Sequence, residues 1–159
     1  MKYTNQEMRR NERGLEEQSA KELLKTANYG VLSLRGEEDG AYGIPLNYAW
    51  DGNDAIYFHC ALEGRKLRCI NLCDKVSFCI VGMEKVIPKK FTTEYQSIIL
   101  DCKASLRLSE VEQLKALELI VDKYSPEFKE EGMKYAQKAL QKTEIVKLTI
   151  EQWSGKSKI

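Results

Sequence analysis

The fold is decided by residues 29–60, which read YGVLSLRGEEDGAYGIPLNYAWDGNDAIYFHC. Apolar and polar side chains alternate here, and clusters of Gly, Asp and Asn interrupt the alternation, which is typical of short β-strands joined by tight turns. The pattern predicts strands over Tyr29–Arg35, Tyr42–Trp50 and Ala55–Cys60, with turns at Gly36–Gly40 and Asp51–Gly52. Because both connections are too short for a crossover, we expect three antiparallel strands in meander order.

Strands and helices continue on both sides of this stretch. The Ser-x-x-Glu pairs Ser19/Glu22 and Ser109/Glu112 are capping boxes and predict helices that end near Asn28 and before Ser125. The other predicted elements are helices over Gly64–Cys73 and Met133–Gln141, strands over Val76–Val81 and Tyr95–Leu106, a piece over Val86–Phe91 that Pro88 interrupts, and a last strand with Val146, Leu148 and Ile150 on one face, ahead of Trp153 and a polar end. Six or so antiparallel strands with helices beside them favour a mainly β fold, a small closed β-barrel of the α+β type with peripheral helices. Residues 1–159 suit one domain with one core.

Composition excludes several classes of partner. The chain has 25 Lys and Arg against 24 Asp and Glu, a net charge of +1, so no large field favours nucleic acid or anionic lipid, and any anion must be bound locally. The N-terminal residues Met1–Arg13 contain no apolar leader segment, and no apolar run approaches the ~20 residues of a membrane span. We therefore expect a cytoplasmic protein that binds neither nucleic acid nor membrane.

The five cysteines do not form a metal-binding or disulfide pattern. Their number is odd and their spacing irregular, which indicates reduced thiols. Cys69 and Cys73 lie four residues apart, with His59 as a conceivable third ligand, but no Cys-x-x-Cys pair is present. We expect no metal.

The segment Ile56–Lys66, IYFHCALEGRK, carries the strongest chemical signal. A strand ends in His59 and Cys60, and a Gly-containing turn leads into two adjacent cations. Gly64 would let the backbone approach a ligand, helix-start amides point outward, and Arg65 and Lys66 can bind a phosphate. The alternative from spacing alone is that these cations form a solvated helix face together with the nearby Arg68.

A family resemblance supports the phosphate interpretation. It is carried by Arg9-Arg10, YGVLSL at Tyr29–Leu34, GIPLNY at Gly43–Tyr48, FHCALEGRKL at Phe58–Leu67 and Gly155-Lys156, and it covers roughly residues 9 to 156. The chain resembles the pyridoxamine 5'-phosphate oxidase-like split barrels, in particular their nitroimidazole-resistance branch. It departs from that branch at Ala41-Tyr42-Gly43, where Pro-Tyr is common, and at Cys102, where Gly is common.

The resemblance implies an antiparallel FMN-binding split barrel, with FAD as an alternative cofactor, and it implies a set of cofactor contacts. These are the strand residues Gly43, Ile44, Pro45, Leu46, Asn47 and Tyr48 beside the flavin ring, His59 and Cys60 near the cofactor, Gly64, Arg65 and Lys66 at its phosphate, Ser97 as a polar contact, and Trp153 and Lys156 at the flavin of a partner subunit. Pro45 itself cannot donate to a sheet ladder, so it marks a bulge or edge that either frees backbone groups for a ligand or shapes the barrel.

Two functions follow from the resemblance. The first is a flavin-dependent oxidoreductase, a homodimer that passes electrons to a small-molecule acceptor such as a nitroaromatic compound. The second is a non-catalytic flavin- or haem-binding module that acts as a carrier, sensor or store. His59 is the only histidine, and its imidazole exchanges protons near neutral pH, so we assign it cofactor or substrate contact first and catalytic proton transfer second.

Overall fold

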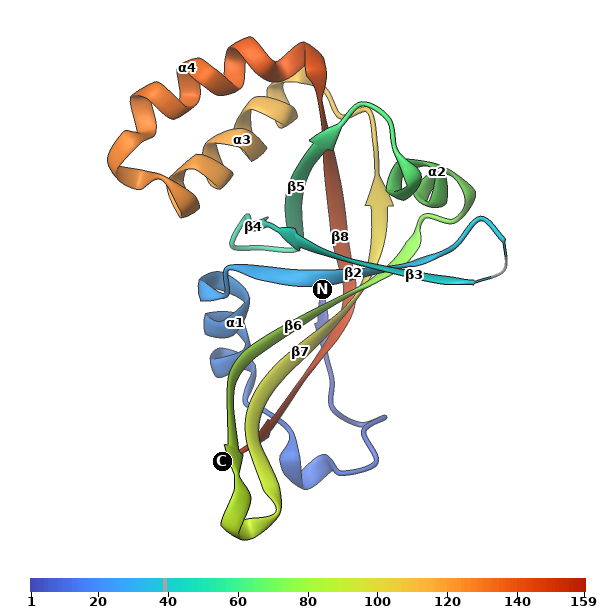
Figure 1. The fold of residues 1–159 in the computed structure, drawn as a ribbon, viewed down its shortest axis with the longest axis vertical. Helices are drawn as coiled ribbons and strands as arrows, with labels where there is room; N and C mark the ends of the chain where they lie inside the picture. The colour runs from blue at the N-terminus through green and yellow to red at the C-terminus, as the bar shows by residue number, and fades with distance from the viewer. Residues whose placement is uncertain (39) are drawn as a thin grey trace.

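One sheet dominates the fold (Figure 1). The computed structural model describes residues 1–38 and 40–159, and in them eight strands pair in the order β3-β2-β6-β7-β8-β5-β4, with β1 added in parallel to β8. The strands are β1 (Lys2–Tyr3), β2 (Tyr29–Arg35), β3 (Ala41–Asn47), β4 (Ala49–Trp50), β5 (Ala55–Ala61), β6 (Lys75–Ile87), β7 (Thr92–Ser105) and β8 (Thr143–Lys158). The helices are α1 (Glu17–Thr26), α2 (Arg65–Leu72), α3 (Glu110–Tyr124) and α4 (Lys129–Ala139). The mainly β, antiparallel fold is confirmed, with eight strands in place of six.

Among the described residues, the two ends of the sheet are linked by the chain and not by strand pairing. The strands at the two ends of the sheet, β3 and β4, are consecutive in sequence and are joined at Tyr48, whose side chain is fully buried. Each predicted hairpin is present, because β2 pairs with β3 and β4 with β5. The predicted middle strand, Tyr42–Trp50, is interrupted at Tyr48: its first part, β3, pairs with β2, and its last part, β4, pairs with β5. The three predicted strands therefore follow meander order, and β2 and β5 take β6 and β8 as their second neighbours.

Alternating side chains fill the interior. In β2 every second residue is buried, and Leu32, Phe78, Leu100 and Trp153 face the core from four successive paired strands. Asp51 shapes the β4–β5 turn by accepting from the amides of Asn53 (2.8 Å) and Ala55 (3.1 Å). The turn predicted at Gly36–Gly40 includes Asp39, which lies outside the described residues.

The helices cover the outside. Ser109 caps α3 as predicted, with its Oγ accepting from the Glu112 amide at 3.3 Å. The capping box at Ser19 is wrong, because α1 already begins at Glu17, with no side-chain cap, and it ends at Thr26. Helices α3 and α4 build a second apolar cluster against β5, which explains why residues 55–58 are buried on both faces. None of the helices in the described parts of the chain is long and apolar enough to cross a membrane.

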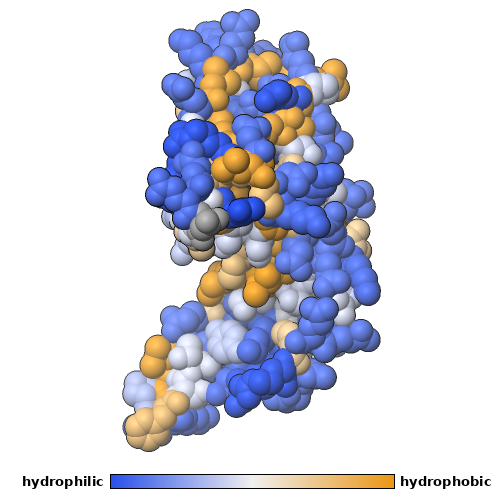
Figure 2. All heavy atoms as spheres, turned by 90° about the vertical axis from the view of Figure 1, so that its right-hand side faces the viewer, coloured by the Kyte–Doolittle hydropathy of each residue, from blue (hydrophilic) through white to orange (hydrophobic). Residues whose placement is uncertain are grey.

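Three strands extend well beyond the barrel. β6 runs on past a bulge between Val81 and Glu84 to Ile87, and β8 continues through the polar end to Lys158 (Figure 1). The predictions ended β6 at Val81, began β7 only at Tyr95, and expected a polar end in place of the last part of β8. On the face seen in Figure 2, apolar side chains gather in patches in the upper and middle parts of the molecule, between hydrophilic flanks.

Candidate functional site

The start of α2 has the geometry expected of an anion-binding corner. Gly64 is the N-cap with φ +148°, a conformation that side chains rarely adopt, and its carbonyl accepts from the amides of Leu67 (3.1 Å) and Arg68 (3.2 Å). A Cβ at Gly64 would meet no atom within 4 Å, so the corner is open to solvent on that side. We call Gly64, Arg65 and Lys66 the α2 corner.

The three cations of α2 differ in their partners. Arg68 forms a bidentate ion pair with Glu37, at 2.6 Å and 3.2 Å. The Arg65 guanidinium lies 4.3 Å from the ring centre of Tyr42 on β3, and neither Arg65 nor Lys66 forms an ion pair within the described residues. Arg68 is therefore neutralised, while the two residues of the corner keep their charge available.

His59 and Cys60 point to opposite sides of β5. His59 is exposed, and its side chain makes no hydrogen bond within residues 1–38 and 40–159, whereas Cys60 is half-buried and packs against the barrel core. Burial raises the pKa of the Cys60 thiol, and the nearby Lys66 ammonium opposes that shift. Only Cys60 thus shares an environment with the α2 corner through its side chain.

The strand predicted to run beside a flavin ring shows two faces. Gly43, Pro45 and Asn47 are exposed, while Ile44 and Leu46 pack toward the core. Tyr48, the next residue, is fully buried, and its hydroxyl donates to the Leu24 carbonyl at 2.6 Å. The Tyr48 side chain therefore belongs to the core, whereas the outward residues of β3 remain accessible to a ligand.

The C-terminal residues of the predicted site lie on β8 beside β7. Ser97 and Lys156 are direct partners across the two strands, and both line a groove with a volume of about 230 Å³. Trp153 is 1% exposed and packs edge-to-face on Tyr3 at 4.7 Å, with its indole nitrogen buried and without a partner in the described chain. The ring is thus enclosed and not free to stack on a ligand at the surface.

Comparison with known families agrees with this architecture. A family model described as pyridoxamine 5'-phosphate oxidase matches residues 16–157. The chain belongs to the pyridoxamine 5'-phosphate oxidase family. The resemblance seen in the sequence is thereby confirmed. A search of curated proteins found no match.

Solved structures place the chain among diverse members of this fold. A candidate 5-nitroimidazole antibiotic resistance protein from Bacteroides thetaiotaomicron is 20% identical, with a TM-score of 0.75 over 89% of this chain and 83% of that one. The flavocytochrome Anf3 from Azotobacter vinelandii is 16% identical, with a TM-score of 0.76 over 95% and 72%. A protein from Mycobacterium smegmatis that binds FAD and haem is 17% identical, with a TM-score of 0.71 over 89% and 71%. At such low identities the likeness establishes the fold alone.

In this family member the two halves of the predicted site lie far apart within one chain. His59 pairs with Ile145 and Ser97 with Lys156, so the halves meet β8 at residues 145 and 156. At ~3.3 Å per residue, these positions are roughly 35 Å apart along the strand. Figure 1 likewise shows α2 in the upper half of the molecule and the C-terminus in the lower half. The structure does not bring His59 and Lys156 together within one chain.

An exposed apolar surface lies on the outer side of the sheet. It consists of residues that share one face across the paired strands β3, β2, β6 and β7, which we call the outer face: Tyr29, Val31, Pro45, Cys79, Val81 and Ile99. Tyr29 is 61%, Val81 59% and Ile99 47% exposed. Apolar side chains this exposed, and contiguous on one sheet, mark a surface suited to a partner or ligand.

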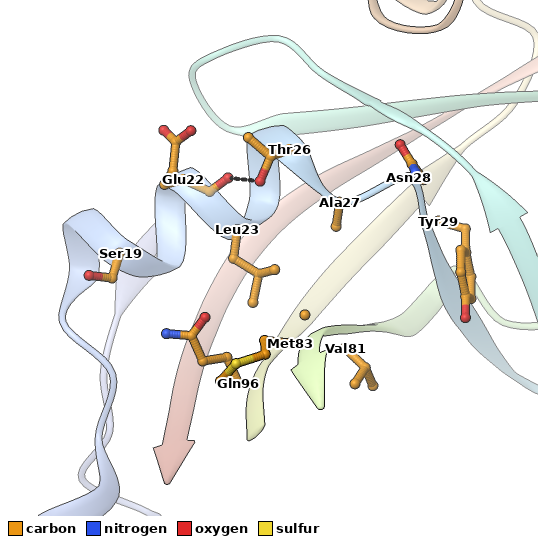
Figure 3. A pocket seen from close by; sticks show the side chains of 11 residues that line it. Ser19, Glu22, Leu23, Thr26, Ala27, Asn28, Tyr29, Val81, Met83 and Gln96 are labelled. Carbon is orange, nitrogen blue, oxygen red and sulfur yellow. Dashed lines mark hydrogen bonds between the residues drawn. The ribbon is translucent and has the colours of Figure 1, made fainter. Parts of the chain in front are cut away.

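A second hollow of about 630 Å³ lies between α1 and the bulge of β6 (Figure 3). Leu23 points from α1 toward Met83 and Gln96. Glu22 is the only charged side chain among its described lining residues, and no predicted cofactor residue lines it. The hollow offers no anchor for a phosphate, so volume alone does not identify the site.

The part that the segment ahead of α1 plays in this region escaped the sequence interpretation. Arg9 and Arg10 supported the family resemblance, but they were not predicted to line the groove that Ser97 and Lys156 share. The signal for them was three arginines within Arg9–Arg13, just ahead of the first helix. The structure also shows no group of three or more metal-ligating side chains within the described residues.

Proposed function

We propose that the chain binds a flavin, with FMN as the expected form, and works as a flavin-dependent oxidoreductase. The α2 corner carries the proposal: Arg65 and Lys66 lack ion-pair partners in the described chain, and they follow a glycine that leaves the approach open. The donor set suits FMN, since cations are available for a phosphate and β3 presents Gly43, Pro45 and Asn47 for a ring.

The corner is tested by removing charge at matched positions on one helix. Protein freed of cofactor is titrated with FMN and, separately, with riboflavin, which has no phosphate. Arg65→Ala and Lys66→Ala should each weaken FMN binding by about 1.5–3 kcal/mol and leave riboflavin binding nearly unchanged. Arg68→Ala is the control, because Arg68 already pairs with Glu37. Unchanged FMN affinity in both corner variants would mean that these cations only face solvent.

We also propose that the working unit is a two-fold dimer. In it the tail of each chain, the C-terminal end of β8 around Lys156, reaches the flavin of the other chain. The ~35 Å between the two halves of the site supports this arrangement, because a partner chain can supply the missing half. The exposed outer face supplies the apolar surface that such an interface needs.

The dimer is tested on the outer face rather than by truncation, since Trp153 belongs to the core. Val81→Asp should convert the dimer to a monomer in light scattering and should lower flavin affinity. Val111→Asp, at a residue of α3 that is 80% exposed, is the control and should remain dimeric. Monomeric parent protein that binds flavin at full affinity would refute the arrangement.

The bound flavin would supply two-electron redox chemistry, and the protein would supply orientation and electrostatics. Lys156 is the proposed contact from the C-terminal end of the partner's β8, and Ser97 on β7 is the proposed polar contact. The backbone of Ile44, Leu46 and Cys60 would lie near the ring. His59 is proposed to contact cofactor or acceptor and to donate a proton. His59→Gln should retain flavin but slow its reoxidation, and equal rates from pH 5 to 8 in variant and parent would remove this role.

A nitroaromatic compound is the proposed acceptor, on the ground that one protein of the same fold is a candidate 5-nitroimidazole resistance protein. A flavin absorbance bleached by reduced nicotinamide and restored by a nitroimidazole would support an enzyme. A flavin that no nitro compound reoxidises would favour the carrier or sensor. Binding of haem by this chain would point the same way, and one protein of the same fold binds FAD and haem.

A further inference from the structure

The N-terminal segment forms a loop whose two ends are fixed to one point of β8. On one side the Asn5 Oδ1 accepts from the Gly155 amide at 3.1 Å. On the other side the Leu15 amide donates to the Gly155 carbonyl at 2.9 Å, and Gly14 bridges to Lys156. Residues 6–13 are therefore held as a closed loop against the strand.

Close packing at the base of this loop explains the glycine at position 155. A Cβ there would lie 2.7 Å from the Tyr3 hydroxyl and 3.0 Å from the Leu15 Cβ. That hydroxyl donates to the Leu15 carbonyl, which also accepts from Asn5 Nδ2 at 3.2 Å. The loop is thus fastened by buried packing and several hydrogen bonds, and a ligand would not have to order it.

The fastened loop covers a groove on β7 and β8. The groove has a volume of about 230 Å³, and we call it the arginine groove; its lining residues are Met8, Arg9, Arg10, Ser97, Ile99, Ser154 and Lys156. Three cations and two hydroxyls line it, together with the apolar Met8 and Ile99. No carboxylate lines it within the described residues, and neither Arg9 nor Arg10 has an ion-pair partner there.

Further positive charge lies beside the groove. Burial alone raises the pKa of the Tyr95 hydroxyl, but hydrogen bonds from Lys156 and Arg13, together with their charges, outweigh it and lower that pKa. The Lys156 ammonium is 6.0 Å from the Tyr95 ring centre. Four cations therefore gather around one concave surface in a chain whose net charge is only +1.

We propose that the arginine groove is a binding site for an oxyanion, the phosphate or carboxylate group of a small molecule. Arg9 is exposed, whereas Arg10 and Lys156 are half-buried. Neighbouring cations without counter-ions repel one another, and an anion that accepts from guanidinium groups and hydroxyls removes that repulsion. The planar guanidinium groups of Arg9 and Arg10 suit bidentate contact with either group. Ile99 and Met8 provide apolar contact for the rest of such a molecule.

This site does not require that flavin binds at the α2 corner, although it shares Ser97 and Lys156 with the flavin contacts proposed above. The oxyanion has two sources that share one chemistry: the phosphate of a flavin, or the acidic group of a separate molecule such as an electron acceptor. These sources differ in whether a bound flavin displaces inorganic phosphate from the groove.

Inorganic phosphate is the probe, followed by amide chemical shifts in ¹⁵N-labelled protein as purified. Saturable shifts are expected to cluster at residues 8–10, 97–99 and 154–156. The double variant R9Q/R10Q should weaken phosphate binding at least about tenfold, as expected for the loss of charge-assisted hydrogen bonds. Arg107→Gln, which removes one positive charge at a position outside the groove, is the control and should bind as the parent does.

The same titration after saturation with FMN or with riboflavin separates the two sources. If FMN alone abolishes the phosphate shifts, the flavin phosphate occupies the groove; if they persist with both flavins, a separate anion does. Absence of saturable shifts in the parent overturns the proposal. Equal weakening in R9Q/R10Q and Arg107→Gln also overturns it, and so do shifts confined to the α2 corner, whether or not FMN itself binds.

Discussion

Replacing Gly64 by alanine should separate backbone strain from packing. Gly64 has φ +148°, and a Cβ there meets nothing within 4 Å, so the substitution adds strain without a clash. The strain costs about 1–3 kcal/mol, and the stiffer unfolded chain returns about 0.4–1 kcal/mol, which leaves a net loss of roughly 0.5–2 kcal/mol. With a typical stability of about 5–15 kcal/mol, the variant still folds. Urea unfolding of cofactor-free protein measures the loss directly.

Gly52→Ala is the matched control, because Gly52 also has a positive φ, +81°, with nothing within 4 Å of its Cβ, but lies in the β4–β5 turn. Both variants should lose stability by similar amounts. Only Gly64→Ala should also lower FMN affinity, since a relaxed φ at the N-cap turns the first amides of α2 away from the corner. If Gly64→Ala costs no stability, the backbone reasoning fails. Equal losses of FMN affinity in both variants would mean that the effect is global.

Three further substitutions test the framework. Tyr48→Phe removes a buried hydrogen bond to Leu24 and should cost about 1–2 kcal/mol in urea unfolding. The Lys147 ammonium lies 2.8 Å from the Glu112 carboxylate and lowers the pKa of that carboxyl. The ion pair therefore stabilises the fold above the ordinary carboxyl pKa, and this stabilisation is lost as pH falls through the lowered pKa. Glu112→Gln should be less stable than the parent at pH 7 and equal to it in acid. Burial lowers the pKa of Lys123 from 10.5 to about 8. Between these two pH values the unfolded chain binds more protons than the folded chain, so the free energy of unfolding should rise with pH across this window. Lys123→Met should abolish that rise.

Local patterns predicted those parts of the fold that depend on local physics. β2 has the predicted bounds, Tyr29–Arg35, because strict alternation with one buried face fixes a strand. α2 follows its glycine as predicted, and the Ser109 cap is formed because hydroxyl and amide lie three residues apart. In each case the deciding contacts lie within a few residues of one another along the chain.

Features that depend on distant partners were not predictable in the same way. The polar end of β8 joins the sheet because β7 pairs with it as far as Lys158, and no pattern within the tail itself signals a strand. The capping box at Ser19 lost to an earlier helix start, and Ala20 and Leu24 of that helix are buried in the barrel core. Trp153 illustrates the same limit at the site, since its burial depends on Tyr3, about 150 positions earlier in the chain.

Because the proposed flavin site is divided between two chains, flavin binding and dimer formation are linked. If the α2 corner of one chain and the tail of another hold the same flavin, each bound flavin adds contacts across the interface, and each interface completes two flavin sites. Flavin binding and dimer formation then stabilise each other by the same free energy, as linkage requires. Gly64 and Gly155 serve different halves of this arrangement: Gly64 opens the corner to a ligand, whereas Gly155 lets the N-terminal loop close onto β8. A substitution at either glycine should therefore weaken both equilibria, although the two residues belong to different halves of the proposed site.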